Sequence, residues 1–328
     1  MSQQLTTSEG FLHFWLVGRN GNAQQLDFSQ LENIQKGEGF HWIHLNRSDP
    51  NVQDWLIRDP DIDATVTESL LAEDTRPRAT PHGDGVLLNL RGINFNPGGE
   101  PEDMVALRMW IEPHRIVTVQ GRNLRAVDSL LQQFISKRPP LTPGDFVADL
   151  AIHIATYMAP TVTDLNAEVD DLEEQVLDAD AGSLRVGLGE LRRKAIMIRR
   201  YLAPQRDALN SLAIQNFPWI TDRDRLRLRE GSDQTTRLTE ELDAVRERAA
   251  IVYDQLVDKR AEEMNRTMLV LAVVAAIFLP LGLIAGMMGM NVGGMPLLES
   301  PLGFWITSAV IALTGAATVA IFKIMKWM

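Results

Sequence analysis

The sequence predicts an α+β membrane protein, with an N-terminal cytoplasmic α/β/α domain, a long stalk helix and two C-terminal transmembrane helices per chain. Three observations support this fold class. Short β-rich runs separated by turn residues occupy segment 1–143. Beyond Pro143 the strand signal disappears and helical spacing replaces it. Two uncharged apolar runs then follow, each of the ~20 residues that a bilayer core requires.

Composition divides the chain into two materials. Of its 328 residues 45% are hydrophobic, yet mean hydropathy is near zero because most charged residues precede the apolar C-terminal part. A net charge of -11 opposes non-specific nucleic-acid binding and favours cations as partners. With no cysteine, disulfides and thiolate zinc sites are excluded. The polar start, Met1–Gly10, lacks the pattern of a secretory signal.

Segment 1–143 is expected to form a sheet with helices on its faces. Asn-Pro-Gly-Gly at Asn96–Gly99 indicates a hairpin turn. Helical spacing covers Val52–Ile57, Ile62–Ala72 and Leu124–Ser136. The expected strands are Phe11–Val17, Phe40–Asn46, Gly85–Ile93, Val105–Glu112 and Arg115–Gln120.

Segment 144–266 is predicted to hold a helical hairpin followed by the stalk. Gly144-Asp145 opens a helix to about Asp180, Gly182-Ser183 breaks the chain, and a second helix follows. The first helix is acidic and the second basic, which favours an antiparallel salt-paired hairpin; a regulatory cation site is the alternative. The acidic residues are Asp164, Glu168, Asp170, Asp171, Glu173, Glu174, Asp178 and Asp180, and the basic ones are Arg185, Arg192, Arg193, Lys194, Arg199, Arg200 and Arg206.

The stalk is predicted from the absence of Gly and Pro between Gly231 and Pro280. One helix of about 48 residues, ~70 Å long, would run from the cytoplasm into the bilayer and link the two mechanically. Its cytoplasmic half carries an apolar seam that packs either on the chain's own helices or on copies of itself. The seam residues are Leu238, Leu242, Val245, Ala249, Val252 and Leu256.

The apolar runs define the membrane segment. Lys259, Arg260 and Arg266 precede the first run and Lys323 and Lys326 follow the second, whereas the connecting loop holds no Lys or Arg. The positive-inside rule therefore places both termini in the cytoplasm. The predicted division is 267–288 for transmembrane helix 1, 289–301 for the external loop, 302–322 for transmembrane helix 2 and 323–328 for the cytoplasmic tail.

Neither span contains an ionisable side chain, so two helices alone cannot form a polar path. An ion route would require several copies of the chain around an axis, lined by backbone and small polar groups. Pro280, Gly282 and Gly286 fit either helix packing or pore lining.

The sequence gives no support to an enzyme. Walker A, HExxH, GxSxG and dinucleotide-binding glycine patterns are absent. His41 and His44 have the look of a metal pair, but residues i and i+3 of a strand point to opposite faces. Separate packing roles are therefore expected for these two histidines.

Gly289-Met290-Asn291, directly after the first span, resembles the signature of the CorA-type metal-ion transporter superfamily. The preceding run LPLGLIAG, the stalk, the charged hairpin and the α/β part agree, so the resemblance covers the whole chain. Two further stretches, LAEDTRPR at Leu71–Arg78 and NLRGIN at Asn89–Asn94, resemble the bacterial zinc transport branch of that family, ZntB. The loop also lacks the aromatic and acidic residues that commonly follow the motif in magnesium transporters.

The resemblance implies a homopentameric funnel in a bacterial inner membrane, with first spans around a central pore and second spans outside. Gly289, Met290 and Asn291 would form the pore entrance and select the ion. Five Asn291 carboxamides would offer neutral oxygens to a transient hydrated divalent cation, whose water hydrogens donate to them. With no Cys in the chain and no His in loop or spans, no tight metal site is assigned.

Helical spacing back from the motif places Gly286, Gly282, Leu279, Ala275 and Leu271 on one face. This stripe is either a pore lining, in which leucine rings gate by dewetting, or a helix-packing seam. The resemblance also implies coupling to protons, although no span residue can carry one. Glu299, the only charge in the loop, and the acidic cytoplasmic surface are the candidates for that role.

We therefore predict zinc transport through a central pentameric pore, with proton-coupled Zn²⁺ uptake as the specific expectation. No cofactor is expected, because Zn²⁺ is cargo. The expected partners are copies of the chain itself, the lipid bilayer, divalent cations and protons, and not nucleic acid. Two alternatives stay open: a CorA-like magnesium or cobalt channel, and a membrane-anchored scaffold or metal sensor.

Overall fold

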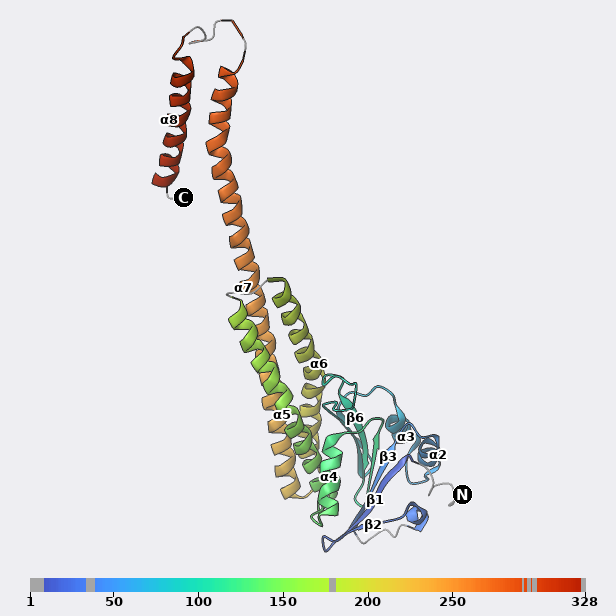
Figure 1. Cartoon of the computed structure of the whole chain (residues 1–328). Coiled ribbons are helices and arrows are strands. Elements are labelled where there is room, and N and C mark those ends of the chain that lie inside the picture. Colours follow the sequence, from blue (N-terminus) through green and yellow to red (C-terminus); the bar gives the residue numbers. More distant parts are fainter. Residues whose placement is uncertain are drawn as a thin grey trace. The chain divides into compact units, whose positions relative to one another are not determined.

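The computed structural model describes residues 9–33, 39–176, 181–290, 292–293, 296 and 300–325 (Figure 1). Contacts between residues divide the chain into two compact units, Met1–Val252 and Tyr253–Met328. The first unit contains a sheet and its covering helices. Helix α7 (Asp222–Met288) begins in the first unit and ends in the second, which also contains α8 (Gly303–Ile324).

A seven-stranded sheet in the order β2-β1-β3-β7-β6-β5-β4 organises the first unit. Only the central β3–β7 pair is parallel among the described strand pairs. The five predicted strands are confirmed and the two edge strands were missed, because β2 is very short and β4 contains Pro81 and little apolar alternation. The strands are β1 (Phe11–Gly18), β2 (Ala23–Gln25), β3 (Gly39–Asn46), β4 (Arg78–His82), β5 (Gly85–Gly92), β6 (Val105–Ile111) and β7 (Arg115–Gln120).

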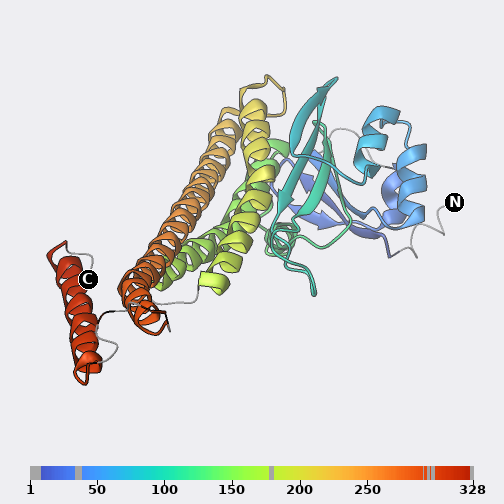
Figure 2. The same cartoon turned by 90° about the horizontal axis from the view of Figure 1, so that it is seen from above.

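Helices cover both faces of this sheet (Figure 2). A short 3-10 helix, η1 (Phe28–Asn33), precedes β3, and α2 (Pro50–Arg58) and α3 (Ala64–Leu71) lie on one face. Asp49 and Asp63 begin these two helices by accepting hydrogen bonds of 2.8 Å from Asn51 N and Thr65 N. The opposite face carries α4 (Arg125–Ile135), α5 (Pro143–Gln175) and α6 (Ala181–Ile214).

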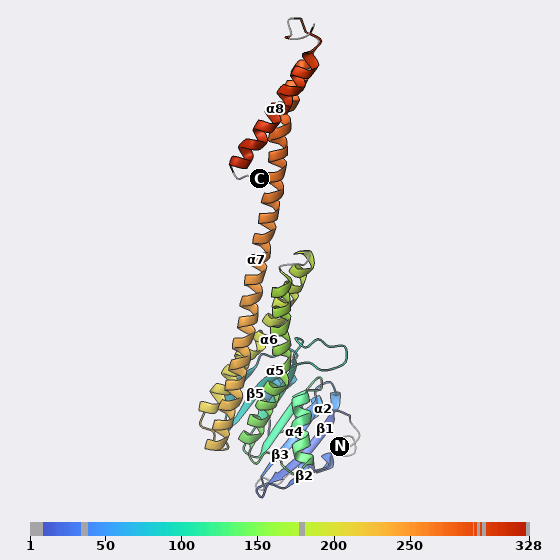
Figure 3. The ribbon, with the colours of Figure 1, turned by 60° about the vertical axis from the view of Figure 1, so that its left-hand side comes forward.

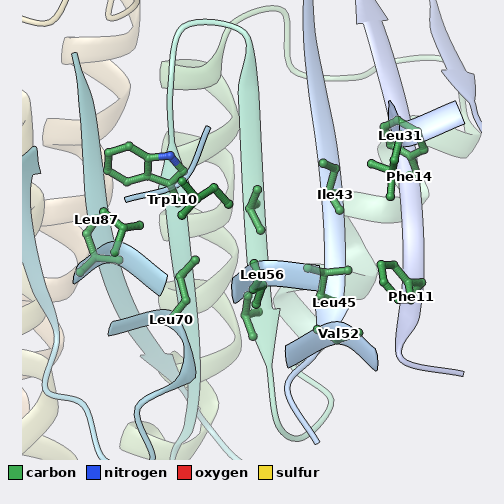
Figure 4. Packing of buried hydrophobic residues seen from close by; sticks show 14 residues of the cluster. Phe11, Phe14, Leu31, Ile43, Leu45, Val52, Leu56, Leu70, Leu87 and Trp110 are labelled. Carbon is green, nitrogen blue, oxygen red and sulfur yellow. The ribbon is translucent and has the colours of Figure 1, made fainter. Parts of the chain in front are cut away.

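The side chains of strand β3 alternate between the two faces of the sheet. Helices cover both faces, so β3 is buried on both sides. Ile43 and Leu45 are fully buried with Leu56 of α2 in the cluster shown in Figure 4. On the other face the ring of Trp42 lies 4.8 Å from that of Phe134 and 5.2 Å from that of Phe146. Each such fully buried side chain stabilises the fold by roughly 1.5–3 kcal/mol relative to exposure.

The two histidines of β3 lie on opposite faces, as predicted. His41 packs near the ring of Phe14, at 5.9 Å between centroids. His44 Nδ1 lies 2.7 Å from Thr118 Oγ1, and its ring stacks on that of His13 at 5.9 Å. Both side chains are buried, and they do not form a metal pair with each other because they point to opposite faces.

Helices α5, α6 and the first half of α7 lie side by side (Figures 1 and 3). Lys194 and Glu168 form the predicted kind of ion pair between α5 and α6, at 3.5 Å. The acidic half of α5 is shared, however, since Arg248 of α7 contacts Asp170 at 2.5 Å and Glu173 at 2.7 Å. The predicted pairing of α5 with α6 is present, and α7 in addition pairs with part of the acidic face of α5.

The end of this hairpin differs from the prediction. Helix α5 ends at Gln175, and Gly182 and Ser183 lie inside the first turn of α6 instead of breaking the chain. Asp178 and Asp180 of the acidic cluster fall outside the described residues. Among the residues that the structure describes, no group of three or more His, Asp or Glu side chains is placed to hold a metal ion.

Helix α7 has 67 residues and is longer than the uninterrupted stretch between Gly231 and Pro280. It begins at Asp222, before Gly231, and continues through Pro280 to Met288, the predicted end of transmembrane helix 1. A Cβ at Gly231 would lie 3.1 Å from Ala151 Cβ, so this glycine allows α7 to approach α5 closely. The five seam residues within the first unit are buried against the chain's own helices, which decides between the two alternatives for that part. They are Leu238, Leu242, Val245, Ala249 and Val252.

Candidate functional site

Two helices of the described chain, α7 and α8, are long and apolar enough to cross a membrane. Nearly all of both apolar segments is exposed in the single chain. Large apolar side chains such as Phe278, Leu283 and Leu313 are 65–71% exposed. Surfaces of this kind are stable only against lipid or other protein, which agrees with the predicted spans.

Within the second unit, α8 covers one face of the apolar part of α7. Val273, Ile277, Leu281 and Ile284 are buried or half-buried at spacings of three and four residues. A Cβ at Gly315 of α8 would lie 3.5 Å from Leu281 Cδ1. This face is therefore the packing seam between the two helices.

The partly buried face of α8 carries several hydroxyl side chains. These hydroxyl groups were not among the predicted site residues. Thr314 and Thr318 donate to Val310 O and Thr314 O of their own helix at 2.8 and 2.9 Å. Their polar groups are thus satisfied without a partner on α7. The signal in the sequence was the helical spacing of the half-buried small and hydroxyl residues Thr307, Ser308, Thr314, Gly315 and Thr318.

The predicted stripe lies away from this seam. Leu271, Ala275, Leu279, Gly282 and Gly286 are all exposed, Leu271 at 64% and Leu279 at 71%. The structure therefore brings the five residues onto a face that the chain's own α8 leaves uncovered. Pore lining and packing between chains both fit such a face, and the pore-lining role stays a prediction.

The Gly-Met-Asn motif begins where α7 ends. Helix α7 stops at Met288, and Gly289 N still donates to Ala285 O at 3.0 Å while Met290 N donates to Met287 O at 3.3 Å. A Cβ at Gly289 would lie 3.3 Å from Ala285 O, so a side chain there would crowd the last turn. Met290 is half exposed.

Two predicted site residues, Asn291 and Glu299, lie outside the described residues. Their roles at the pore entrance and in proton handling stay predictions. The uncovered stripe of α7 holds no ionisable group and ends at Gly286, three residues before Gly289 of the motif.

Comparison with known proteins identifies the family to which this chain belongs. Residues 37–323 match the family described as CorA-like Mg2+ transporter protein. The chain therefore belongs to this family of membrane transporters, and is a divalent-cation transporter of the CorA and ZntB type.

Among its relatives, the divalent cation transporter CmaX of Pseudomonas aeruginosa is 33% identical over 97% of both chains. The zinc transport protein ZntB of Yersinia pseudotuberculosis is 31% identical over 88% of both. The solved structure of full-length CmaX superposes with a TM-score of 0.83 at 31% identity, covering 97% of this chain and 98% of that one. The CorA magnesium transporter of Methanocaldococcus jannaschii, at 21% identity and a TM-score of 0.82 over 96% and 98%, shares the fold.

Proposed function

We propose that this chain takes up Zn²⁺ through the central pore of a homopentamer, coupled to the proton gradient. The observation that carries the pore is the uncovered stripe of α7, which leads to the Gly-Met-Asn motif on the face opposite α8. The choice of zinc is supported by the relatives named zinc transport protein and by the neutral start of the loop. The protein is then a secondary transporter and not an enzyme.

The proposed mechanism uses hydration. Five copies of the stripe would enclose an apolar path with two wide glycine levels, at Gly282 and Gly286, near the motif, and narrower leucine levels farther from it. A dication held by carboxamide oxygens of Asn291 keeps its water shell, because those oxygens accept hydrogen bonds from bound water and no thiolate or imidazole competes. Leu279 and Leu271 would form constrictions that conduct only when wetted.

The setting follows from the same proposal. The protein lies in the bacterial inner membrane with both termini in the cytoplasm, and only the loop faces outward. It needs no resident cofactor, since the metal is cargo. Its partners are four further copies of the chain, the bilayer, the divalent cation and the coupling proton, with Glu299 and the acidic cytoplasmic surface as candidate proton groups.

A magnesium or cobalt channel is the second candidate, and the description of the family as a Mg2+ transporter favours it. The two functions differ in selectivity and in energy source. The scaffold or sensor hypothesis has no comparable support, because the relatives CmaX and ZntB are named as transporters.

The deciding experiment measures Zn²⁺ entry into proteoliposomes that contain the purified protein, with and without an imposed pH gradient and with Mg²⁺ as competitor. Zinc entry that the gradient accelerates and Mg²⁺ does not suppress is the expected result. Magnesium flux that is indifferent to the gradient would establish the channel instead. Absence of flux for both ions would return the scaffold to consideration.

The motif is tested by Asn291→Ala, which should abolish most zinc flux. Asn166→Ala is the matched control, because Asn166 lies on α5, outside the spans, and within the described part of the chain its amide donates to Val162 O of its own helix, at 3.2 Å. Wild-type flux in Asn291→Ala would contradict the assignment of the pore entrance.

A further inference from the structure

Helices α5 and α6 run side by side in opposite directions (Figure 1). Lys194 of α6 and Glu168 of α5 form an ion pair at 3.5 Å, which marks the sides on which the two helices face each other. Residues two positions away from these lie about 200° around each helix. Such residues are therefore on the side of each helix that its partner in the hairpin does not cover.

The uncovered side of α6 is basic. Arg192 and Ile196, two residues before and two residues after Lys194, are both exposed, Ile196 at 45%. The ion pairs that α6 forms among the described residues do not include Arg192. Arginine is enriched at protein interfaces, and an exposed apolar side chain beside it gains stability from burial.

The uncovered side of α5 is acidic. Asp170, two residues after Glu168, has a side chain that is 63% exposed, and the exposed Glu174 lies one turn farther along the same face. Arg248 of α7 contacts Asp170 and Glu173, whereas Glu174 has no ion pair among the described residues. Three carboxylates thus share one guanidinium, and the face keeps an excess of negative charge.

The basic and acidic faces lie at the same height of the hairpin. Asp170 is two residues from Glu168 toward the C-terminal end of α5, and Arg192 is two residues from Lys194 toward the N-terminal end of α6. Because the helices are antiparallel, both steps lead toward the same end of the hairpin. Two hairpins placed side by side at equal height would therefore bring Arg192 of one copy opposite Asp170 of the other.

A ring of copies has this arrangement. In a closed ring of five, each chain contacts its two neighbours through two different faces, which must be complementary to each other. Rotation about an axis that runs along the helices leaves every residue at its own height. A basic face and an acidic face at one height of one hairpin meet both requirements.

We propose that α6 of each copy packs on α5 of the next copy in the ring, with Arg192 and Ile196 of one copy facing Asp170 and Glu174 of the next. The inference rests on the homopentamer of the proposed function and adds the surface through which the first units join. It is independent of which cation is transported, because the four residues lie outside the spans.

Cross-linking tests the contact. The chain contains no cysteine, so introduced thiols report a contact without background. Ala167→Cys and Ile196→Cys together put one thiol on each face, since Ala167 is exposed and lies one residue before Glu168. The full-length variant in detergent is treated with a short bifunctional maleimide and run on a denaturing gel. We expect bands from dimer to pentamer for the double variant and monomer for each single variant, because the contact joins unlike faces.

The matched control is Glu168→Cys with Lys194→Cys, whose positions pair within one chain and should give cross-linked monomer. Native mass spectrometry of the same samples before cross-linking separates this inference from the proposed function. A pentamer that gives no ladder of bands would overturn the α5–α6 contact and leave the homopentamer intact. Absence of the pentamer itself would contradict the homopentamer, and this inference with it.

Charge reversal in the Ala167→Cys, Ile196→Cys background tests the pairing. Arg192→Glu brings like charges together and should remove most of the ladder. Adding Asp170→Arg reverses both faces in every copy, so the ladder should return. Arg58→Glu, at an arginine of α2 whose side chain is 60% exposed, should leave the ladder unchanged. A ladder that Arg192→Glu does not weaken, or that the second reversal does not restore, would overturn the proposed pairing.

Discussion

The stacked, buried His44 makes the first unit sensitive to acid in a way that can be calculated. Burial, with a smaller contribution from His13, lowers the pKa of His44 from 6.5 to about 3. Neutral His44 fits its site because Thr118 Oγ1 lies 2.7 Å from Nδ1, while the same oxygen accepts from Trp42 Nε1 at 2.9 Å. Protonation would place a charge among aromatic rings.

The direction of the pH effect on stability follows from the difference in proton binding between the folded and unfolded states. The folded-state pKa lies below the unfolded value, so the unfolded chain binds the proton more readily. The stabilising effect of the neutral ring is complete above pH ~6.5 and is lost as the pH falls toward 3. Between pH 8 and pH 5 the expected loss in unfolding free energy from this residue is about 2 kcal/mol.

The assay is chemical denaturation of the full-length protein in detergent at pH 8, 7, 6 and 5, followed by tryptophan fluorescence. His44→Asn keeps a hydrogen-bonding group near the position of Nδ1 but cannot titrate. Its unfolding free energy should therefore fall less steeply with acid than that of the wild type, by about 2 kcal/mol at pH 5. Lowered pKa values of His13, His41 and His153 act in the same direction and remain in both proteins.

The control is His82→Asn, at a histidine whose side chain is 48% exposed, and this variant should follow the wild type. Parallel pH curves for His44→Asn and the wild type would refute the reasoning. That result would mean that water or local rearrangement accommodates the imidazolium.

Three further predictions concern the helices. Leu242→Ala, at a fully buried seam position, should lower the unfolding free energy by roughly 2–5 kcal/mol. Leu226→Ala, at a side chain that is 65% exposed on the same helix, should change the unfolding free energy little. Equal midpoints of the two variants in denaturant would contradict the packing of the seam. Arg248→Gln should lower the unfolding free energy by less than about 1 kcal/mol, and this difference should vanish in high salt, because the Arg248 side chain is partly exposed and its ion pairs are screened. A large loss that does not depend on salt would contradict the interpretation of these contacts as surface ion pairs. Gly315→Ala should be tolerated, since its Cβ would make an ordinary 3.5 Å contact with Leu281. Gly315→Leu should separate α8 from α7 and lower both heat stability in detergent and ion flux. Wild-type stability and flux of the leucine variant would contradict the packing of this face of α8 on α7.

Local patterns in the sequence located most elements. Strands β1, β3, β5, β6 and β7 were found because apolar and β-branched residues mark a buried strand wherever it pairs. Edge strands β2 and β4 escaped because an edge buries little and needs no such residues. Gly231 was taken as the start of the uninterrupted stalk stretch on propensity alone, but α7 begins before it, at Asp222, because packing against neighbouring helices overrides that propensity.

Partners were harder to predict than elements. Opposite charges on α5 and α6 indicated one hairpin, but Arg248, which is 75 residues from Glu173 in the chain, takes part of the acidic face. The stripe of α7 and the stretches Leu71–Arg78 and Asn89–Asn94 could be recognised in the sequence as motifs. The sequence did not show which residues surround them, such as the contact of Arg91 with Asp74. Arg91 N donates to Gln205 across 114 residues, a contact that no local pattern specifies.

The sequence by itself determined the two apolar spans, five of the seven strands, the family signature and the absence of charge in the spans. These features depend on hydropathy, period and spacing, which are properties of neighbouring residues. The tertiary structure alone decided which face of α7 the helix α8 covers, and which helix pairs with the acidic side chains of α5. Those outcomes depend on distances between residues far apart in the chain, and packing sets such distances only when the whole fold is formed.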